Sequence, residues 1–554
     1  MNNSRLFLYA ALAFIGLLMW EQWQADYGPK PTPVVEQQAA AANSQAVQQA
    51  GANKDDLPDL TGLANDVISD KPPSSAMQGK LITVITDEVE AKIDTLGGVI
   101  KSVKLKKYPV DIEHPDDYLE LIHNEPDSVY LVQSGLRSSV NPAPTHYSQY
   151  QTEKDEYRME DGANTLKVPF VWEQDGIKVI KTYEFTRGDY LFKMQQRVIN
   201  GSDNEWVGSQ YRQLQRSRPL TTSKLLYTYT GAVVYNEEIK YEKIDFDDME
   251  EQNFKLASKG GWVAMLQHYF LSAWIAKPEE NNLMYSIANT QRYPKTYTIG
   301  MRSDSIKVAP GAEASFDSEF FVGPKIVERL EEISPGLELT VDYGALTFIS
   351  KPLYWILDFF YNLTGNWGVA IILLTLLVKA LFYKLSEKSY ISMARMRKVS
   401  PRLKALKDRY GDDRAAMNKA MMDLYKTEKI NPLGGCLPML VQMPVFIGLY
   451  WALLEAVSLR QAPFIFWIDD LSIPDPYYIL PLLMGISMII QQKLSPTPMA
   501  DPIQAKMMMA LPVVFSIFFA FFPSGLVLYW VSNNVLTIAQ QWVITKRIDA
   551  GEDL

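Results

Sequence analysis

Two patterns of apolar residues divide this 554-residue chain into two large regions. Between residues 80 and 335 apolar and polar residues alternate in short runs, and turn sequences containing glycine separate them. In Lys178–Phe185, for example, Val179, Tyr183 and Phe185 share one parity. Alternation with a period of two residues is typical of strands that bury one face. The pattern therefore predicts an all-β sandwich at 80–335.

Long apolar stretches replace this alternation in the C-terminal third of the chain. A membrane-spanning helix needs about 20 apolar residues. Five stretches approach or exceed this length: 366–383, 433–457, 477–491, 507–522 and 526–543. The last two come from one apolar run, which the turn sequence Pro523-Ser524-Gly525 interrupts. Ahead of the first, residues 353–361 repeat at helical spacing, so an amphipathic helix at the membrane surface is predicted within 336–365.

A further apolar segment begins the chain. Leu6–Trp20 follows a positively charged end and lacks a small-residue cleavage sequence after it, while Trp20 and Trp23 suit a membrane interface. Residues 1–24 are therefore predicted to be an uncleaved signal-anchor helix, which makes six spans in total. A cleaved signal peptide is the alternative. Residues 25–79, rich in Pro, Gln and Ala, predict a flexible periplasmic linker.

The charges between the spans predict their orientation. Residues 384–429 carry 13 Lys or Arg and 6 Asp or Glu, although the whole chain has a net charge of −10. By the positive-inside rule this loop lies in the cytoplasm, which places the sandwich in the periplasm and the tail 546–554 in the cytoplasm. Ser400-Pro401 suits a helix start, and Asp412 or Asp413 suits the cap of a second helix. The loop is therefore predicted to be a helical hairpin.

The basic residues of this hairpin have two interpretations. They either set only the topology and contact lipid headgroups, or they form a docking surface for protein partners or for anionic partners such as ribosomal RNA. The docking candidates are Arg395, Arg397, Lys398 and Arg402.

Residues suited to metal binding, redox chemistry or covalent catalysis are scarce. Cys436 is the single cysteine, and the four histidines have no ligand spacing, so no disulfide and no metal site is expected. No nucleotide-binding or hydrolase motif occurs, and no cofactor is expected. The acidic residues of the sandwich are interpreted as solvated surface groups, with a glycosidase-like pair as the alternative. The chain is therefore predicted not to be an enzyme.

Polar side chains within the predicted spans mark the candidate site. Lys379 lies one helical turn after Thr375, and a lysine at mid-membrane depth costs about 2.5–3.5 kcal/mol. Gln442 belongs to the next span. The last span adds Ser532, Asn533, Asn534, Gln540 and Gln541. One interpretation is a snorkelling lysine and plain interhelical hydrogen bonds, worth about 0.6 kcal/mol each. The other is a hydrated cavity that holds an uncompensated cation.

Methionine and phenylalanine residues in these spans also have two interpretations. Core packing is one, and a flexible surface that binds varied apolar partners is the other.

Short sequence stretches in a fixed order connect the chain to a known family. They are Asn366-Trp367-Gly368, Ser392–Arg397, Asn431–Cys436, Gln442-Met443-Pro444, Leu459–Phe464, Asp475–Pro481 and Phe522–Tyr529. In these stretches the chain resembles the YidC/Oxa/Alb family of membrane protein insertases, most densely from about residue 350 to 545. The looser match over the sandwich agrees with the Gram-negative form of that family.

The resemblance implies an insertase core at 366–545, whose five spans form a groove open to the cytoplasm and to lipid but closed on the outside. The family often has arginine where this chain has Lys379, which keeps the charge but not the bidentate geometry. Matching positions give the groove residues Thr375, Lys379, Ser524, Tyr529 and Trp530, to which the polar pattern adds Gln442 and Asn533. The implied contacts to a substrate helix are Met443, Pro444, Phe446 and Phe518. Many relatives carry Tyr at the position of Trp530.

The implied function is the insertion, folding and assembly of integral proteins of the bacterial inner membrane, alone or with the Sec translocon. The implied partners are nascent membrane proteins, the Sec translocon with SecD/SecF, the translating ribosome and membrane lipids. The outer sandwich resembles a sugar-enzyme-like fold without its catalysis. One alternative is a transporter or channel, which predicts internal repeats and midplane carboxylates. The other is a tethered carbohydrate enzyme, which predicts a carboxylate pair in a cleft.

Overall fold

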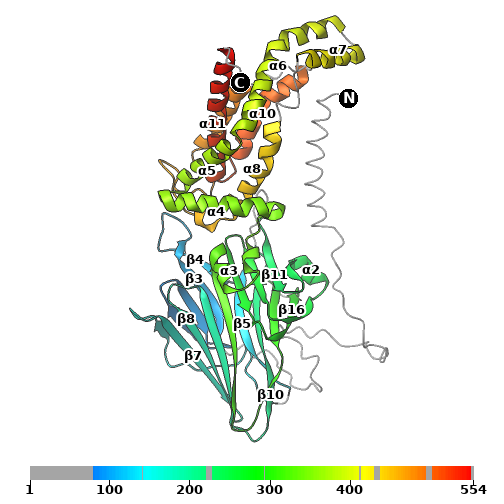
Figure 1. Ribbon diagram of the computed structural model, residues 1–554. Coiled ribbons are helices and arrows are strands. Elements are labelled where there is room, and N and C mark those ends of the chain that lie inside the picture. The colour runs from blue at the N-terminus through cyan, green and yellow to red at the C-terminus, as the bar shows by residue number, and fades with distance from the viewer. Residues whose placement is uncertain are drawn as a thin grey trace, which may run out of the picture.

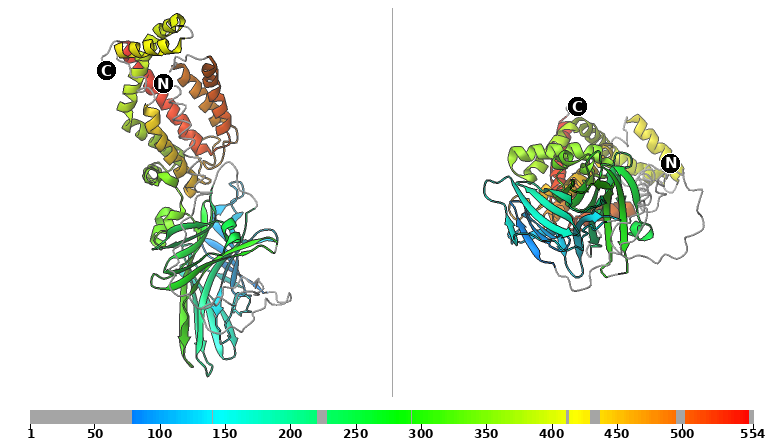
Figure 2. Two further views of the ribbon diagram at one scale, coloured as in Figure 1. Left: turned by 90° about the vertical axis from the view of Figure 1, so that its right-hand side faces the viewer. Right: turned by 90° about the horizontal axis from the view of Figure 1, so that it is seen from below.

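The computed structural model has two parts, a β-sandwich and a bundle of helices stacked on one end of it (Figures 1 and 2). It describes residues 79–139, 141–219, 228–291, 293–410, 413–428, 437–494 and 502–550. The signal anchor predicted at 1–24 and the linker predicted at 25–79 lie outside the described residues, apart from Gly79.

Two antiparallel sheets form the sandwich. The larger has 11 strands, in the order β13 (Lys255–Lys259), β16 (Asn281–Asn289), β17 (Thr296–Ser303), β10 (Trp206–Ser217), β5 (Val129–Arg137), β4 (Tyr118–Asn124), β3 (Val99–Pro109), β2 (Val89–Asp94), β1 (Leu81–Ile85) and β6 (Glu156–Arg158), with β18 (Ile306–Val308) paired to β10. In this sheet β6 alone is recorded as parallel, to β1. The second has eight strands, in the order β12 (Lys240–Ile244), β11 (Thr230–Asn236), β14 (Trp262–Gln267), β15 (Phe270–Ile275), β19 (Glu313–Pro324), β9 (Leu191–Asn200), β8 (Ile177–Thr186) and β7 (Thr165–Gln174).

The period-two pattern produces these strands because alternate side chains face the space between the sheets. In β8 every second residue is buried, including Val179, Tyr183 and Phe185, and the residues between them are half-buried. Gly188, at a φ of 71°, belongs to the turn that leads into β9. The predicted all-β sandwich is therefore confirmed.

Lys181 of β8 is a charged exception within this core. Its Nζ donates hydrogen bonds to the carbonyls of Gly97 (2.7 Å) and Ser134 (2.9 Å) and lies 5.2 Å from the ring centre of Tyr150. Burial lowers the pKa of Lys181 to about 7. These bonds tie β8 to the larger sheet across the core.

Helices make up the second part and the connections to it. They are α2 (Phe246–Glu251), α3 (Val327–Ile333), α4 (Thr347–Thr364), α5 (Trp367–Leu381), α6 (Tyr383–Tyr410), α7 (Arg414–Thr427), α8 (Leu437–Glu455), α9 (Ile479–Leu494), α10 (Pro502–Phe519) and α11 (Ser524–Asp549). Three 3-10 turns are η1 (Leu337–Thr340), η2 (Gly344–Leu346) and η3 (Val457–Leu459). Figure 1 shows α4 lying across the end of the sandwich, between it and the other helices.

The sharp turn between α4 and α5 follows from two residues. Gly365 ends α4 at a φ of 68°, which glycine adopts without steric cost. Asn366 then caps α5, because its Oδ1 accepts a hydrogen bond from the backbone N–H of Val369 (3.0 Å).

Five of these helices, α5, α8, α9, α10 and α11, occupy the positions of the five C-terminal spans predicted from the sequence. The break between α10 and α11 falls at residues 520–523, beside the predicted turn. Within the described ranges no single helix has both the length and the apolar character of a membrane span. The pair formed by α5 and Tyr383–Met393, bent by 67°, meets both criteria together. The number of spans therefore stays a prediction.

The predicted start of the first hairpin helix was wrong. Ser400-Pro401 was expected to begin it, but α6 runs without a break from Tyr383 to Tyr410 with Pro401 inside. An interior proline costs about 3 kcal/mol. Packing of α6 against α11 and α7, which includes the Arg402–Glu428 ion pair, offsets this cost. Asp413, one of the two predicted caps, caps α7 by accepting from the N–H groups of Ala415 and Ala416.

A buried ion pair joins the two parts of the molecule. Lys325 follows β19, and its Nζ lies 2.8 Å from Oε2 of Glu455 at the end of α8; the two side chains are only 4% and 5% exposed. The same Nζ donates to the carbonyl of Thr340 (3.1 Å). Between β14 and β15, Nε2 of His268 lies 3.1 Å from the carbonyl oxygen of Leu454. The outer end of α8 is thereby fixed to the sandwich.

Removing one member of this pair should destabilise the junction. Lys325→Ala leaves the carboxylate of Glu455 buried without a counter-charge, for which we expect a loss of about 3–5 kcal/mol. The double variant Lys325→Met/Glu455→Leu should recover most of it. Thermal unfolding of the full chain in nanodiscs measures both. The control is Lys259→Ala, which breaks an exposed pair with Glu279 and should leave the unfolding temperature almost unchanged; an equal loss from both lysine variants would contradict the prediction.

Acid should weaken the same junction through His268. Burial, together with the nearby Lys325 ammonium, lowers the pKa of this imidazole from 6.5 to about 4. As the pH falls, His268 is therefore protonated in the unfolded chain before it is protonated in the folded chain. The stability that the neutral imidazole contributes is complete above pH 6.5 and is lost between pH 6.5 and about 4. The slope is at most about 1.4 kcal/mol per pH unit. His268→Gln should flatten the plot of unfolding temperature against pH over this interval, and an unchanged slope would argue against it.

Candidate functional site

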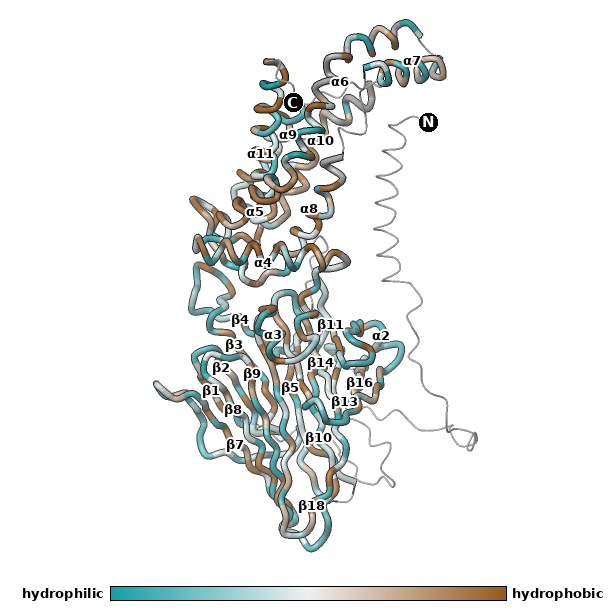
Figure 3. The backbone as a smooth tube through the Cα atoms, in the orientation of Figure 1, coloured by the Kyte–Doolittle hydropathy of each residue, from teal (hydrophilic) through white to brown (hydrophobic). Residues whose placement is uncertain are grey.

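A polar cluster lies between three helices of the bundle, two of which, α5 and α8, are mainly apolar (Figure 3). Lys379 of α5 donates from Nζ to Oγ1 of Thr537 in α11 (2.7 Å) and to Oε1 of Gln442 in α8 (3.4 Å). Nε2 of Gln442 in turn donates to Oδ1 of Asn533 in α11 (2.6 Å). The hydroxyl of Thr537 donates a hydrogen bond to the backbone carbonyl of Asn533 (2.6 Å), which leaves the Thr537 oxygen free to accept from the lysine. The four side chains form one connected network.

Helix geometry accounts for the positions of these groups. Asn533 and Thr537 are four residues apart, so they share one face of α11. Thr537 lies 13 residues after Ser524 in a helix of 26 residues, which places it about 20 Å from the outer end of α11 at 1.5 Å per residue. The ammonium group of Lys379 is therefore held near the middle of α11 rather than at an end.

The cluster is accessible and carries a net positive charge. Lys379, Gln442 and Asn533 are half-buried and keep part of their surface exposed, whereas Thr537 is buried. None of the ion pairs recorded for the described residues includes Lys379. Its hydrogen-bond partners are neutral oxygens, which solvate the ammonium without cancelling its charge.

Aromatic side chains from three helices pack beside this cluster. Phe446 of α8 meets Trp530 of α11 edge-on, with ring centres 4.6 Å apart, and stacks on Tyr529 at 5.9 Å. Phe519 of α10 lies 5.1 Å from Trp530. The Tyr529 hydroxyl interacts with the Gln442 side chain, so the aromatic layer and the polar cluster are in direct contact.

The outer end of the bundle is tightly packed. Ser524, at the start of α11, donates from its N–H (2.7 Å) and its hydroxyl (2.8 Å) to the carbonyl of Ile473. The N–H of Gly525 donates to the carbonyl of Leu471 (2.9 Å). The cavity beside these bonds measures about 10 Å³, which is at the lower limit for a single water molecule. It is lined by Tyr450, Leu453, Leu454, Leu459, Leu471, Pro523, Gly525 and Leu526.

The structure separates the predicted site residues into groups. Lys379, Gln442 and Asn533 are in contact, and Tyr529 and Trp530 pack beside them. The remaining predicted residues are Thr375, Ser524, Met443, Pro444, Phe446 and Phe518. Thr375 is buried and donates its hydroxyl to the carbonyl of Ile371 within its own helix (2.7 Å).

The predicted substrate contacts differ in exposure. Met443 of α8 and Phe518 of α10 are exposed, whereas Pro444 and Phe446 are half-buried. Ser524 lies at the packed outer end of α11, 13 residues before Thr537, which binds Lys379. The predicted residues therefore fall into three successive groups: a polar cluster, an aromatic layer in contact with it, and a packed outer end.

The predicted docking residues lie in one helix. Arg395, Arg397, Lys398 and Arg402 all belong to α6. Arg402 Nη1 lies 2.5 Å from Oε1 of Glu428, which follows α7, so this pair links the two hairpin helices.

Thr537, the nearest hydrogen-bond partner of Lys379, was not predicted as a site residue. A threonine among apolar residues attracts no attention, although its spacing of four from Asn533 places the two on one helix face. Asn534 and Gln541 were predicted in one group with Asn533, but they face α9 instead. Asn534 Nδ2 donates to Oγ of Ser487 (3.0 Å), and Gln541 Nε2 donates to a carbonyl at the end of α9 (3.1 Å). These two are interhelical hydrogen bonds that hold α9 to α11.

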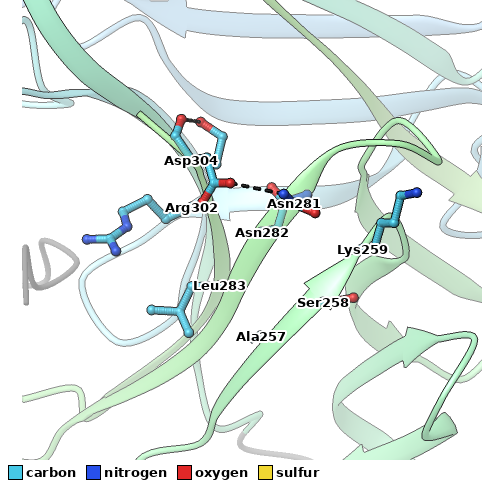
Figure 4. Close-up of a pocket in the computed structure, with 9 residues that line it drawn as sticks. Ala257, Ser258, Lys259, Asn281, Asn282, Leu283, Arg302 and Asp304 are labelled. Atoms are coloured by element: carbon cyan, nitrogen blue, oxygen red, sulfur yellow. Dashed lines mark hydrogen bonds between the residues drawn. The ribbon is translucent and has the colours of Figure 1, made fainter. Parts of the chain in front are cut away.

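The sandwich has a polar pocket of about 410 Å³ at its β13–β16–β17 edge (Figure 4). It is lined by Ala257, Ser258, Lys259, Asn281, Asn282, Leu283, Arg302, Ser303 and Asp304. Asp304 is the one acidic residue of this lining and accepts from Asn281 Nδ2 (3.1 Å). The pocket therefore lacks the carboxylate pair that a tethered carbohydrate enzyme predicts.

Comparisons with known proteins cover almost the whole chain. The family model described as the YidC periplasmic domain matches residues 81–356, and the one described as 60Kd inner membrane protein matches residues 359–551. The membrane protein insertase YidC of Thioalkalivibrio sulfidiphilus is 50% identical over 562 residues, covering 99% of both chains. That of Methylococcus capsulatus is 48% identical over 554 residues, also covering 99% of both.

One similar solved structure is an active YidC insertase with its first transmembrane domain resolved. The alignment covers 84% of this chain and 94% of the solved chain, with a TM-score of 0.38 and 17% sequence identity. The family models and the full-length relatives carry the assignment, and they favour neither a transporter nor an enzyme. The sandwich is the periplasmic domain of an inner-membrane protein. The chain therefore belongs to the YidC family of membrane protein insertases.

Proposed function

We propose that Lys379, Gln442, Asn533 and Thr537 form the hydrated, positively charged floor of a groove that receives the polar end of a membrane protein during its insertion. The observation that carries this proposal is the ammonium group of Lys379, held near the middle of α11 by neutral partners alone. Substrates of this kind are what an insertase acts on, and no bond is made or broken by the protein.

The electrostatics support a role in attracting substrates. A carboxylate beside Lys379 would leave no net charge, whereas neutral oxygens keep the full positive charge available to an acidic segment. A polar group that enters hydrocarbon without hydrogen bonds loses several kcal/mol. A partly exposed set of donors and acceptors lowers that cost. Lys379 lies in the last turn of α5, but snorkelling explains it less well, because its Nζ is bonded to side chains of α8 and α11.

The closed outer end supports a groove rather than a channel. The aromatic layer and the backbone bonds of Ser524 and Gly525 lie on the outer side of the polar cluster. With residues 384–429 in the cytoplasm, a substrate enters from that side and has to leave sideways into lipid. Exposed Met443 and Phe518, on α8 and α10, suit contact with its apolar helix, with Pro444 and Phe446 behind them.

The remaining parts of the proposal come from the sequence and from the family resemblance. We include six spans, with residues 1–24 as the first, and an interfacial helix at α4. The hairpin 384–429 engages substrate, the translating ribosome or the Sec translocon. The periplasmic sandwich contacts SecD/SecF or assists folding.

Reversing the groove charge should impair insertion. We expect Lys379→Glu to reduce insertion of a single-span substrate with an acidic translocated end by about tenfold or more, because like charges ~4 Å apart repel by about 4 kcal/mol at an effective dielectric of 20. Lys379→Arg should retain most of the activity. Protease protection of the translocated end, in liposomes that contain the purified full chain without nucleotide, measures insertion. Equal activity of the Glu and wild-type proteins would exclude the charge as a determinant.

Two neighbouring asparagines test the cluster against simple helix packing. Asn533→Leu removes the partner of Gln442 within the groove, so insertion should fall while α9 stays packed on α11. Asn534→Leu removes the bond to Ser487, so stability should fall by about 0.6 kcal/mol with insertion nearly unchanged. The same protection assay and thermal unfolding separate the two effects. A larger loss of insertion for Asn534→Leu than for Asn533→Leu would contradict the assignment.

A further inference from the structure

The connection between α8 and α9 exposes an unusual amount of apolar surface. Phe466 is 85% exposed, and Tyr477 and Tyr478 are 67% and 57% exposed. The exposed apolar side chains of this connection are Ile465, Phe466, Ile473, Tyr477 and Tyr478, which we call the aromatic loop patch. Asp469 is the one charged side chain exposed among residues 462–478.

The patch is held in place by a buried carboxylate. Asp475 is almost fully buried and accepts hydrogen bonds from Nε1 of Trp467 (3.1 Å) and from the N–H groups of Tyr477 (3.0 Å) and Leu480 (2.7 Å). It thereby fixes both ends of the loop and the first turn of α9. The ring of Phe466 stacks on Trp467, with ring centres 6.1 Å apart.

Backbone strain adds to the cost of presenting these rings. Phe466 and Tyr478 have φ values of 58° and 57°, in the left-handed region that bulky residues rarely adopt. Each such residue costs about 1–3 kcal/mol and persists where the surrounding structure holds it. A loop that holds strained, exposed aromatic rings in water gains nothing from them, so a partner that covers the rings is required to explain them.

The patch is continuous with surfaces that face the membrane. Nδ2 of Asn366, at the α4–α5 turn, donates to the carbonyl of Phe464 (3.0 Å), which joins the loop to the end of α4. One face of α4 exposes Phe348, Trp355, Phe359 and Leu363. On the other side, α9 begins directly after Tyr478 and exposes Leu482, Leu483 and Ile486. The patch thus lies between an amphipathic helix and the apolar flank of a predicted span.

We propose that the aromatic loop patch is a second interfacial anchor, which inserts between the headgroups and acyl chains of the outer leaflet beside α4. Tyrosine and phenylalanine rings at the end of a membrane helix suit this layer, because their apolar bodies enter lipid while the tyrosine hydroxyls stay hydrated. The exposed residues of the patch carry almost no charge, so contact with lipid is more favourable for them than contact with a charged protein surface.

The anchor also links the sandwich to the membrane surface. Arg460 Nη2 and Gln461 Nε2, just ahead of the patch, both donate to the carbonyl of Pro109 at the end of β3 (2.6 Å and 2.9 Å). Insertion of the patch therefore holds the periplasmic sandwich close to the bilayer. This inference does not depend on the groove proposal.

Depth-dependent fluorescence quenching tests the anchor. The full chain in a Cys436→Ser background carries an environment-sensitive fluorophore at Phe466→Cys and is reconstituted in phosphatidylcholine/phosphatidylglycerol vesicles. We expect stronger quenching by lipids with a nitroxide near the headgroup than by lipids with a nitroxide deep in the acyl chain, and weak quenching by iodide in water.

The matched control is Tyr293→Cys, an 80% exposed tyrosine in the sandwich on the same side of the membrane. Its label should be quenched by iodide and not by nitroxide lipids. Trp355→Cys on α4 gives the reference for an interfacial position, and Ile473→Cys replaces Phe466→Cys if that variant does not fold. Iodide quenching of the loop label equal to that at Tyr293, with no nitroxide effect, would overturn the proposal and point to a protein partner instead.

Discussion

A lysine among apolar helices, held beside the middle of α11 and without an ion-pair partner among the described residues, is the constraint on which the helical domain depends. The ammonium of Lys379, in the last turn of α5, takes its hydrogen-bond partners from two neighbouring helices. Gln442 and Thr537 supply them, and Asn533 orients Gln442. Neutral partners satisfy the lysine without cancelling its charge. The same arrangement holds three helices together.

A second lysine, Lys325, is paired with a carboxylate instead of neutral groups. Lys325 is buried at the junction with the periplasmic sandwich, and there the carboxylate of Glu455 neutralises it at 2.8 Å. A buried charge pair contributes little net stability but penalises any arrangement that separates its members, so it defines how two parts dock. Both environments involve α8, which carries Gln442 of the polar cluster and Glu455 at its outer end. The sandwich therefore fixes the end of a helix that contributes to the cluster.

Local sequence patterns predicted the sandwich and the break between two helices, because these features depend on local physics. Period-two alternation predicts the sandwich, since strands bury every second residue, and Pro523 predicts the break between α10 and α11. The same approach failed at Pro401, where a proline typical of a helix start lies inside the continuous α6. Packing of α6 against neighbouring helices outweighs a local cost of about 3 kcal/mol there, and no local pattern reports that packing.

The sequence by itself determined which side chains are costly in an apolar environment: Lys379, Gln442 and the polar residues of α11. It could not decide which of them face each other. Asn533 joins the lysine cluster while its neighbour Asn534 binds Ser487, and Thr537 becomes the closest partner of Lys379. Successive residues on a helix point about 100° apart, so only the positions of the surrounding helices decide what each one meets. The cost of burying a polar group belongs to its residue type, whereas the choice of partner belongs to the tertiary structure.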